Sequence, residues 1–185
     1  PRSVLGIDWL LSLISVGAAA QSYPAKPVRI IVPFPAGGGI DTVTRMISPK
    51  LIESLGQPIV IDNRPGAGGD IGIEMAAKAA STGYTLLATF SSLASNAALY
   101  TRPGFDTLND FAPITLIATV PNVLVTNPSL PVKTVRELIT LAKKHPGEIL
   151  YASIGPGSPA HLSAELFNST AGIKMTHVPY KGGPQ

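Results

Sequence analysis

The sequence predicts an α/β protein with mainly parallel sheets, because three strand–turn–helix units follow one another along its first half. Residues 28–32 are apolar and mostly β-branched, as in a strand buried inside a sheet. Short apolar runs at 59–62 and 85–90 repeat this pattern, and each leads through a polar turn into a helical period. Each parallel crossover needs its own helix, so three successive units favour a parallel sheet covered by helices.

The first unit carries the strongest local signals. Two prolines end the strand, and Gly37, Gly38 and Gly39 form a turn whose backbone can take positive φ and approach a bound group. A helical period then runs over residues 43–55, and Gly56 stands where a C-terminal cap is expected. Asp41 opens this helix, where it either serves as the N-cap or binds an amino group of a ligand.

Such a unit aims free backbone N–H groups and the positive end of a helix dipole at one point, which suits a small anion. Phosphate and carboxylate are both candidates. The turn lacks the Gly-Lys-Ser/Thr ending of a P-loop, and GGGID is not GxGxxG, which counts against a nucleotide. The alternative is that the glycines only allow the helix to pack closely on the sheet.

The next two units place further polar turns after strands. The second turn is glycine-rich, with the sequence NRPGAGG at 63–69, and a helix is expected over 71–79. Ser91 and Ser92 follow the third strand and precede a helix over 94–99. Ligands of parallel sheets gather beyond the carboxyl ends of the strands, where all of these turns would lie.

The second half of the chain repeats the architecture after a polar stretch at 101–110 that could be a hinge. Strands are expected at 114–120 and 123–126. Thr134 and Glu137 form a capping box at the start of a helix that Pro146 and Gly147 end. A strand at 149–153, a turn at 155–157 and a helix from the N-cap Ser158 to residue 171 complete the pattern.

Composition excludes several classes of function. The chain of 185 residues is 45% hydrophobic and 14% charged, so it can bury a core, and its net charge of +3 indicates no nucleic-acid partner. With no cysteine, it can form no disulfide, thiolate metal site or cysteine nucleophile.

The first twenty residues have the form of a secretory signal peptide. Arg2 precedes an apolar run over 10–20 that ends in Gly-Ala-Ala-Ala, which predicts export and a mature start near Gln21. The run is short for a membrane span, and the alternative is a buried N-terminal helix.

No catalytic or metal-binding pattern is present. His145, His161 and His177 are widely separated and fit no metal-ligand spacing, so no metal is predicted. The sequence GPGSP at 155–159 departs from the GxSxG of serine hydrolases. His161 either donates to a ligand or packs its helix. Polar turns from two halves without a catalytic set indicate a two-lobed binding protein without a cofactor.

Seven ordered motifs resemble the extracytoplasmic solute receptors of tripartite tricarboxylate transporters, the Bug family. They run from about Tyr23 to the last residue. They are PVRIIVPFPAGGGID, IDNRPGAGGDIG, GYTLL, DFAPITLIA, NVLVTNPSLPVKTVRELITLAKKHPG, YASIGPGSPAHLSAELF and HVPYKG.

The resemblance implies a fold similar to type II periplasmic binding proteins, with two α/β lobes that close over a small carboxylate. It places a signal peptide at 1–20, the first lobe at 21–103 and the second lobe at 104–185. It implies a receptor in the periplasm of a Gram-negative cell, which hands a di- or tricarboxylate or related organic acid to membrane permease subunits.

The same resemblance assigns ligand-binding residues to both lobes and no catalytic residue. Loops of the first lobe would hold a carboxylate through main-chain N–H groups and ordered water, its serines would add hydroxyls, and the second lobe would contact the ligand from the other side. These residues are Phe34, Pro35, Ala36, Gly37, Gly38, Gly39 and Asp41; Gly66, Ala67, Gly68 and Gly69; Ser91 and Ser92; and Ser153, Gly155, Ser158 and His161.

Members of the family continue beyond VPYKG, complete the second lobe and return to the first, whereas this sequence ends at Gln185. A fragment or a truncated gene product is therefore expected, with both lobes incomplete and the polypeptide unstable alone. The competing hypothesis is an α/β enzyme of acyl-transfer or phosphate-handling type that uses Ser153 or Ser158.

Overall fold

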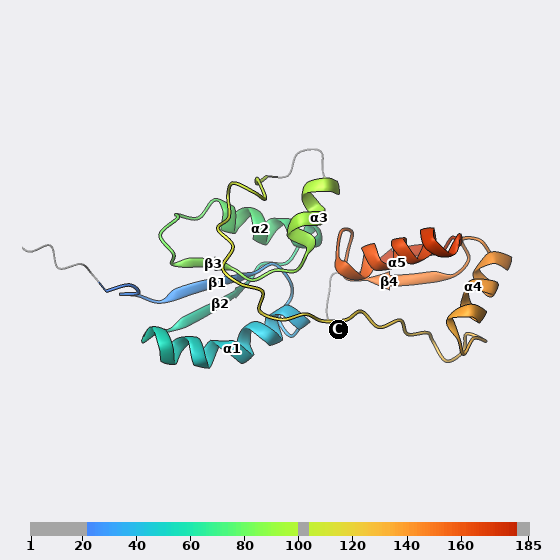
Figure 1. The fold of residues 1–185 in the computed structure, drawn as a ribbon, viewed down its shortest axis with the longest axis horizontal. Coiled ribbons are helices and arrows are strands. Elements are labelled where there is room, and N and C mark those ends of the chain that lie inside the picture. The colour runs from blue at the N-terminus through green and yellow to red at the C-terminus, as the bar shows by residue number, and fades with distance from the viewer. Residues whose placement is uncertain (1–21, 100–103, 181–185) are drawn as a thin grey trace, which may run out of the picture.

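A computed structural model of the protein describes residues 22–99 and 104–180 (Figure 1). The expected signal peptide at 1–20 lies outside the described residues, as does part of the expected hinge. Within the described ranges, no helix is long and apolar enough to cross a membrane.

The first half folds as the three predicted units. They comprise β1 (Val28–Val32) with α1 (Gly39–Leu55), β2 (Ile59–Asn63) with α2 (Asp70–Ala77), and β3 (Thr85–Leu87) with α3 (Ser92–Leu99). The three strands form one parallel sheet in the order β2-β1-β3, with Ile30 opposite both Ile61 and Leu86. The central strand β1 has a strand on each side, and its four apolar side chains are buried. The predicted parallel sheet is confirmed.

A compact apolar cluster holds these units together. Ile30, Val32, Phe34, Ile40 and Ala88 are buried in it, and Phe34 packs against Phe90 with ring centroids 5.2 Å apart. The cluster therefore fixes the strand ends, and with them the loops that leave the sheet.

The ends of the helices follow the sequence signals except at one point. Gly56 adopts φ +65° and its N–H donates to Ile52 O, which confirms it as the C-terminal cap of α1. The expected N-cap role of Asp41 is wrong, because α1 begins at Gly39 with Gly38 as its N-cap and no side chain in that role.

The second half contains α4 (Val135–Lys144), β4 (Leu150–Ser153), α5 (Pro159–Ala171) and β5 (Thr176–Pro179). Strands β4 and β5 pair in parallel. The Thr134–Glu137 capping box at α4 and the N-cap Ser158 at α5 are both confirmed.

The expected strands at 114–120 and 123–126 are wrong. Residues 104–134 belong to no helix or strand, and Figure 1 shows them as a long extended connection (yellow to orange) from the first sheet to α4. Apolar side chains there are exposed, with Leu116 at 78% and Val125 at 81%. A strand is stabilised by pairing with a neighbouring strand, and no strand pairs with this segment in the described part of the chain.

Candidate functional site

The loops that follow β1, β2 and β3 lie at one edge of the first sheet, because the three strands are parallel. The positions that a Cβ atom on a glycine would occupy show how closely these loops pack. At Gly69 it would lie 3.2 Å from the Phe34 ring, and at Gly39 it would lie 3.9 Å from the Phe90 ring. The three predicted loops of the first half therefore form one surface.

In the loop before α1, only Gly37 of the three glycines has positive φ, at +80°. Gly38 is extended, with φ −72° and ψ 168°, and its N–H donates to Pro35 O over 3.3 Å. The N–H groups of Gly39 and Ile40 open the helix and have no acceptor within it. They are the donors that this loop can offer to an anion.

Asp41 is 1% exposed and lies beneath this loop. Its carboxylate accepts hydrogen bonds from Gly37 N at 2.8 Å, Arg45 Nε at 2.9 Å and Asn63 Nδ2 at 3.0 Å. The hydrogen bond from Arg45, together with those from Gly37 and Asn63, lowers the pKa of Asp41 to about 2 against the opposing effect of burial. The carboxylate is therefore ionised and fully engaged within the protein.

The loop after β2 has an unusual backbone. Gly66, Ala67, Gly68 and Gly69 all have positive φ, and residues 67–69 form a 3-10 turn before α2. A non-glycine residue such as Ala67 adopts this conformation at a cost of about 1 kcal/mol. Local strain of this kind is concentrated at functional sites.

The loop after β3 contains two buried hydroxyl groups without a partner among the described residues. Ser92 is 0% exposed, and neither its Oγ nor Thr89 Oγ1 has a hydrogen-bond partner there. A buried hydroxyl without a partner is costly unless a water molecule or a ligand satisfies it. Thr89 was missed from the sequence, since nothing in the pattern TLLATF distinguishes it from an ordinary strand residue. Ser91, by contrast, is exposed and accepts the N–H of Ala94 at its carbonyl.

In the second half, the turn after β4 is stabilised by its own serines. Ser158 Oγ donates to Gly155 O at 2.7 Å and accepts the N–H of His161 at 3.3 Å. Ser153 Oγ accepts the N–H of Gly155 at 3.0 Å. Ser153 is 6% exposed and Ser158 is fully buried, and both hydroxyls shape the turn.

The structure brings together two histidines that are far apart in the sequence. The rings of His161 and His177 lie 4.2 Å apart, and His177 stacks on Tyr151 at 5.0 Å. His177 Nε2 lies 2.6 Å from Ser153 Oγ, and Tyr151 OH donates to Glu165. The β4–β5 register, which places Tyr151 opposite His177, explains this cluster, but no local pattern predicts it.

Burial shifts the pKa of two members of this cluster, His177 and Tyr151. It lowers the pKa of His177, assisted by His161 and opposed by Glu165, and it raises the pKa of Tyr151 together with the nearby Glu165. His161 Nδ1 accepts the N–H of Gly157 at 3.2 Å. Within the described residues, no group of three or more His, Asp and Glu side chains is arranged to hold a metal.

The loops of the two halves meet each other. Ser95 Oγ on α3 donates to Gly157 O at 3.2 Å, and a Cβ at Gly155 would lie 3.8 Å from Gly68 Cα. Ile154 packs against the apolar cluster of the first sheet. The structure thus brings the predicted segments 34–41, 66–69, 91–92 and 153–161 to one place.

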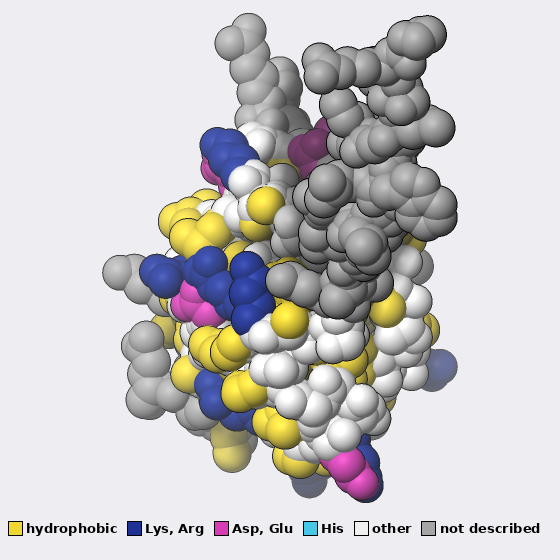
Figure 2. All heavy atoms as spheres, turned by 90° about the vertical axis from the view of Figure 1, so that its left-hand side faces the viewer, with side chains coloured by type: hydrophobic (Ala, Val, Ile, Leu, Met, Phe, Trp, Pro, Cys, Tyr) yellow, Lys and Arg dark blue, Asp and Glu magenta, His cyan; other side chains and the backbone are white. Residues whose placement is uncertain are grey.

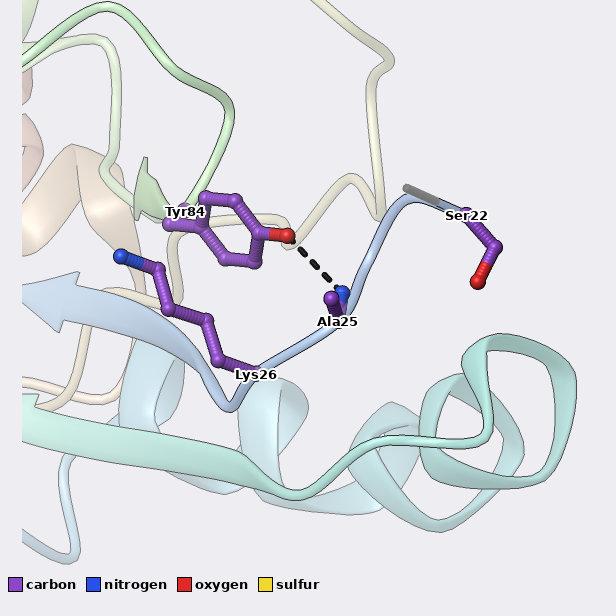
Figure 3. Close-up of a pocket in the computed structure, with 4 residues that line it drawn as sticks. All are labelled: Ser22, Ala25, Lys26 and Tyr84. Carbon is purple, nitrogen blue, oxygen red and sulfur yellow. Dashed lines mark hydrogen bonds between the residues drawn. The ribbon is translucent and has the colours of Figure 1, made fainter. Parts of the chain in front are cut away.

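A separate shallow hollow lies near the amino ends of β1 and β3. Figure 3 shows Ser22, Ala25, Lys26 and Tyr84 around it, with the N–H of Ala25 donating to Tyr84 OH at 2.8 Å. None of the predicted site residues lines this hollow. Its position before the strands, rather than after them, separates it from the candidate site.

Cationic side chains on the first half are largely neutralised by acidic ones. Arg29 and Arg64 both pair with Asp62, the latter at 2.8 Å, and Lys78 pairs with Glu74. In the face shown by Figure 2, Lys and Arg side chains (dark blue) stand beside Asp and Glu (magenta) or between apolar ones. Beside the candidate loops, Arg45 pairs with Asp41 and Arg64 with Asp62, so the donors there are chiefly backbone groups and hydroxyls.

Two α/β units whose polar loops face each other define the class of two-lobed periplasmic binding proteins, and solved structures of that class match this chain. An R. palustris protein solved with adipate superimposes with a TM-score of 0.81 at 42% identity, covering 86% of this chain and 54% of that one. MatC from Rhodopseudomonas palustris, solved with bound malate, gives a TM-score of 0.79 at 32% identity, with 86% and 55% covered.

Sequence comparison identifies the family of this chain. A family model described as tripartite tricarboxylate transporter family receptor matches residues 43–185, and the chain belongs to that family. Protein BugT of Bordetella pertussis is 43% identical over 98% of this chain and 57% of its own length. That family is one of receptors, and the two solved structures hold organic acids, which counts against the competing enzyme hypothesis. The chain spans about half the length of the curated relatives that it matches.

Proposed function

We propose that the complete protein is an extracytoplasmic receptor that captures a small organic acid and delivers it to the permease of a tripartite tricarboxylate transporter. In this proposal residues 21–103 belong to the first lobe and residues 104–185 to the second, and the ligand is a di- or tricarboxylate or related acid. The signal-like residues 1–20 would direct export to the periplasm.

The observation that carries this proposal is the meeting of loops from both halves where the helix N-termini of α1 and α5 lie. The N–H groups of Gly39 and Ile40 begin α1, and that of Ala160 lies in the first turn of α5. Helix N-termini favour negative charge, and backbone donors hold it without an ion pair. A receptor benefits from such a site, because a carboxylate bound by neutral dipoles can still be released.

The hydroxyl groups complete this proposed site. Buried Ser92 Oγ and Thr89 Oγ1 lack partners among the described residues and would be satisfied by the ligand or by water that bridges to it. The two proteins named above bind adipate and malate, which are small dicarboxylic acids. Small dicarboxylic acids are therefore the ligand class that we propose for this receptor.

A thermal-shift screen of the complete gene product against organic acids, followed by calorimetry of those that stabilise it, tests the proposal. Saturable 1:1 binding of at least one di- or tricarboxylate is expected. An ester-hydrolysis assay in parallel should show no turnover above buffer. Absence of binding by every acid would contradict the receptor function, and turnover that is lost in Ser158→Ala would restore the enzyme hypothesis.

A further inference from the structure

Asp41 is the acidic side chain that lies within the proposed carboxylate-binding loop. Its two carboxylate oxygens accept hydrogen bonds from three donors. Oδ2 accepts from Gly37 N and Arg45 Nε, and Oδ1 accepts from Asn63 Nδ2. With 1% of its surface exposed, it presents almost nothing to a ligand.

This network ties both ends of the loop to the sheet. Asn63, at the end of β2, donates through Nδ2 to Phe34 O at 3.1 Å as well as to Asp41. Arg45 reaches back to Asn63 Oδ1 over 3.3 Å. The loop is therefore fixed at Phe34 and at Gly37, which determines where the free N–H groups of Gly39 and Ile40 point.

The charges of the network also suit an anion. The buried carboxylate of Asp41, in the first turn of α1, would by itself repel a bound carboxylate. Arg45 lies one helical turn away and pairs with Asp41 at 2.9 Å, which offsets this charge. An ammonium group on the ligand would have to displace Arg45 from Asp41 in order to form an ion pair. The free groups of the loop are N–H donors, which an ammonium group cannot use.

We infer that Asp41 is a positioning residue that shapes the loop at 34–41 without touching the ligand. This inference rests on the proposed function. It replaces the expectation that Asp41 binds the ligand directly.

Two pairs of acids that differ only by an amino group provide the probes: succinate with aspartate, and adipate with 2-aminoadipate. Calorimetry uses the complete gene product, as wild type and as Asp41→Asn. In Asp41→Asn both members of a pair should weaken by the same factor, on the order of tenfold, through loss of the charged hydrogen bonds.

A residue that touches an ammonium would behave differently. Asp41→Asn would then weaken only the amino-bearing acid and leave its partner unchanged, and that result would overturn the inference. Loss of binding by every acid of the screen would refute the proposed function, whereas a selective loss in Asp41→Asn refutes the inference alone.

The control is Asp62→Asn, since Asp62 is also held by two arginines, Arg29 and Arg64, but lies on β2 and makes no hydrogen bond to the loop. Its affinity for each acid should stay within about threefold of wild type, a difference of about 0.6 kcal/mol. If Asp41→Asn does not fold, Arg45→Met tests the same network. It should weaken both acids of a pair, whereas a direct contact would make the amino-bearing acid bind more tightly to the freed carboxylate.

Discussion

Gly68 of the first half lies against the carbonyl group of Pro156 in the second half so closely that a Cβ at Gly68 would overlap the carbonyl oxygen. Gly68 also has φ +65°. A side chain is therefore excluded for two separate reasons, the backbone conformation and the contact between the halves. Only the second reason concerns how the two glycine turns meet.

Gly68→Ala is expected to weaken ligand binding by holding the two turns apart. The matched control is Gly56→Ala, which has the same φ of +65° and nothing within 4 Å of the added Cβ. Both substitutions carry the backbone penalty of about 1 kcal/mol, and Gly68→Ala should lower thermal stability further because its Cβ also overlaps the carbonyl oxygen of Pro156. Only Gly68→Ala should raise Kd, on the order of tenfold or more. Equal affinities of the two variants in calorimetry would show that the turns do not meet in the ligand-bound protein.

Arg64 should be dispensable for anion binding. It lies next to the second glycine turn, but its guanidinium pairs with Asp62 at 2.8 Å. Arg64→Met should therefore change Kd by less than about tenfold, or 1.4 kcal/mol. A loss on the order of a thousandfold, about 4 kcal/mol, would mean that the ligand is held by a conventional ion pair.

His177 should make stability depend on pH below its ordinary pKa of 6.5. Because burial lowers its pKa in the folded state, the unfolded chain binds more protons between the folded-state pKa and 6.5. The free energy of unfolding should therefore fall as the pH drops below 6.5. In His177→Gln that part of the slope should disappear, whereas His145→Gln, at the exposed end of α4, should retain it. Urea unfolding between pH 5 and 7.5 measures the slopes, and an unchanged slope in His177→Gln would refute the assignment.

The apolar connection at 114–125 should drive aggregation when residues 21–185 are expressed alone. Leu116, Val123 and Val125 are 78–81% exposed, and no strand covers them within the described part of the chain. Exposed apolar segments of high β-propensity associate with one another. Size-exclusion chromatography should show aggregates that decrease when these three residues are replaced by lysine. A monodisperse monomer of the unmodified polypeptide would contradict this expectation.

The features that local chemistry determines could be predicted from the sequence. The β1–turn–α1 unit, the cap at Gly56 and the capping box at Thr134 each depend on a few consecutive residues, and all three are observed. The N-cap of α1 could not be assigned in this way. Gly38 takes an extended conformation there, and Asp41 is instead bound by Arg45 and Asn63, of which Asn63 is 22 residues away.

Features that depend on distant pairing were missed. The segment at 114–126 has strand-like composition, but a strand needs a neighbour, and composition does not report one. The His161–His177 contact depends on the register between β4 and β5, which sequence spacing does not reveal. The candidate loops themselves could be predicted, because parallel strands place their carboxyl ends at one edge.

The measurement that tests the account most directly is calorimetry of the complete gene product with small dicarboxylic acids, beginning with succinate, malate and adipate, at pH 7.5. The account predicts saturable 1:1 binding of at least one of them, unaffected by Arg64→Met and weakened by Gly68→Ala. Binding of none of these acids, or binding that is abolished by Arg64→Met and unchanged by Gly68→Ala, would contradict a carboxylate site built from the backbone loops of two lobes.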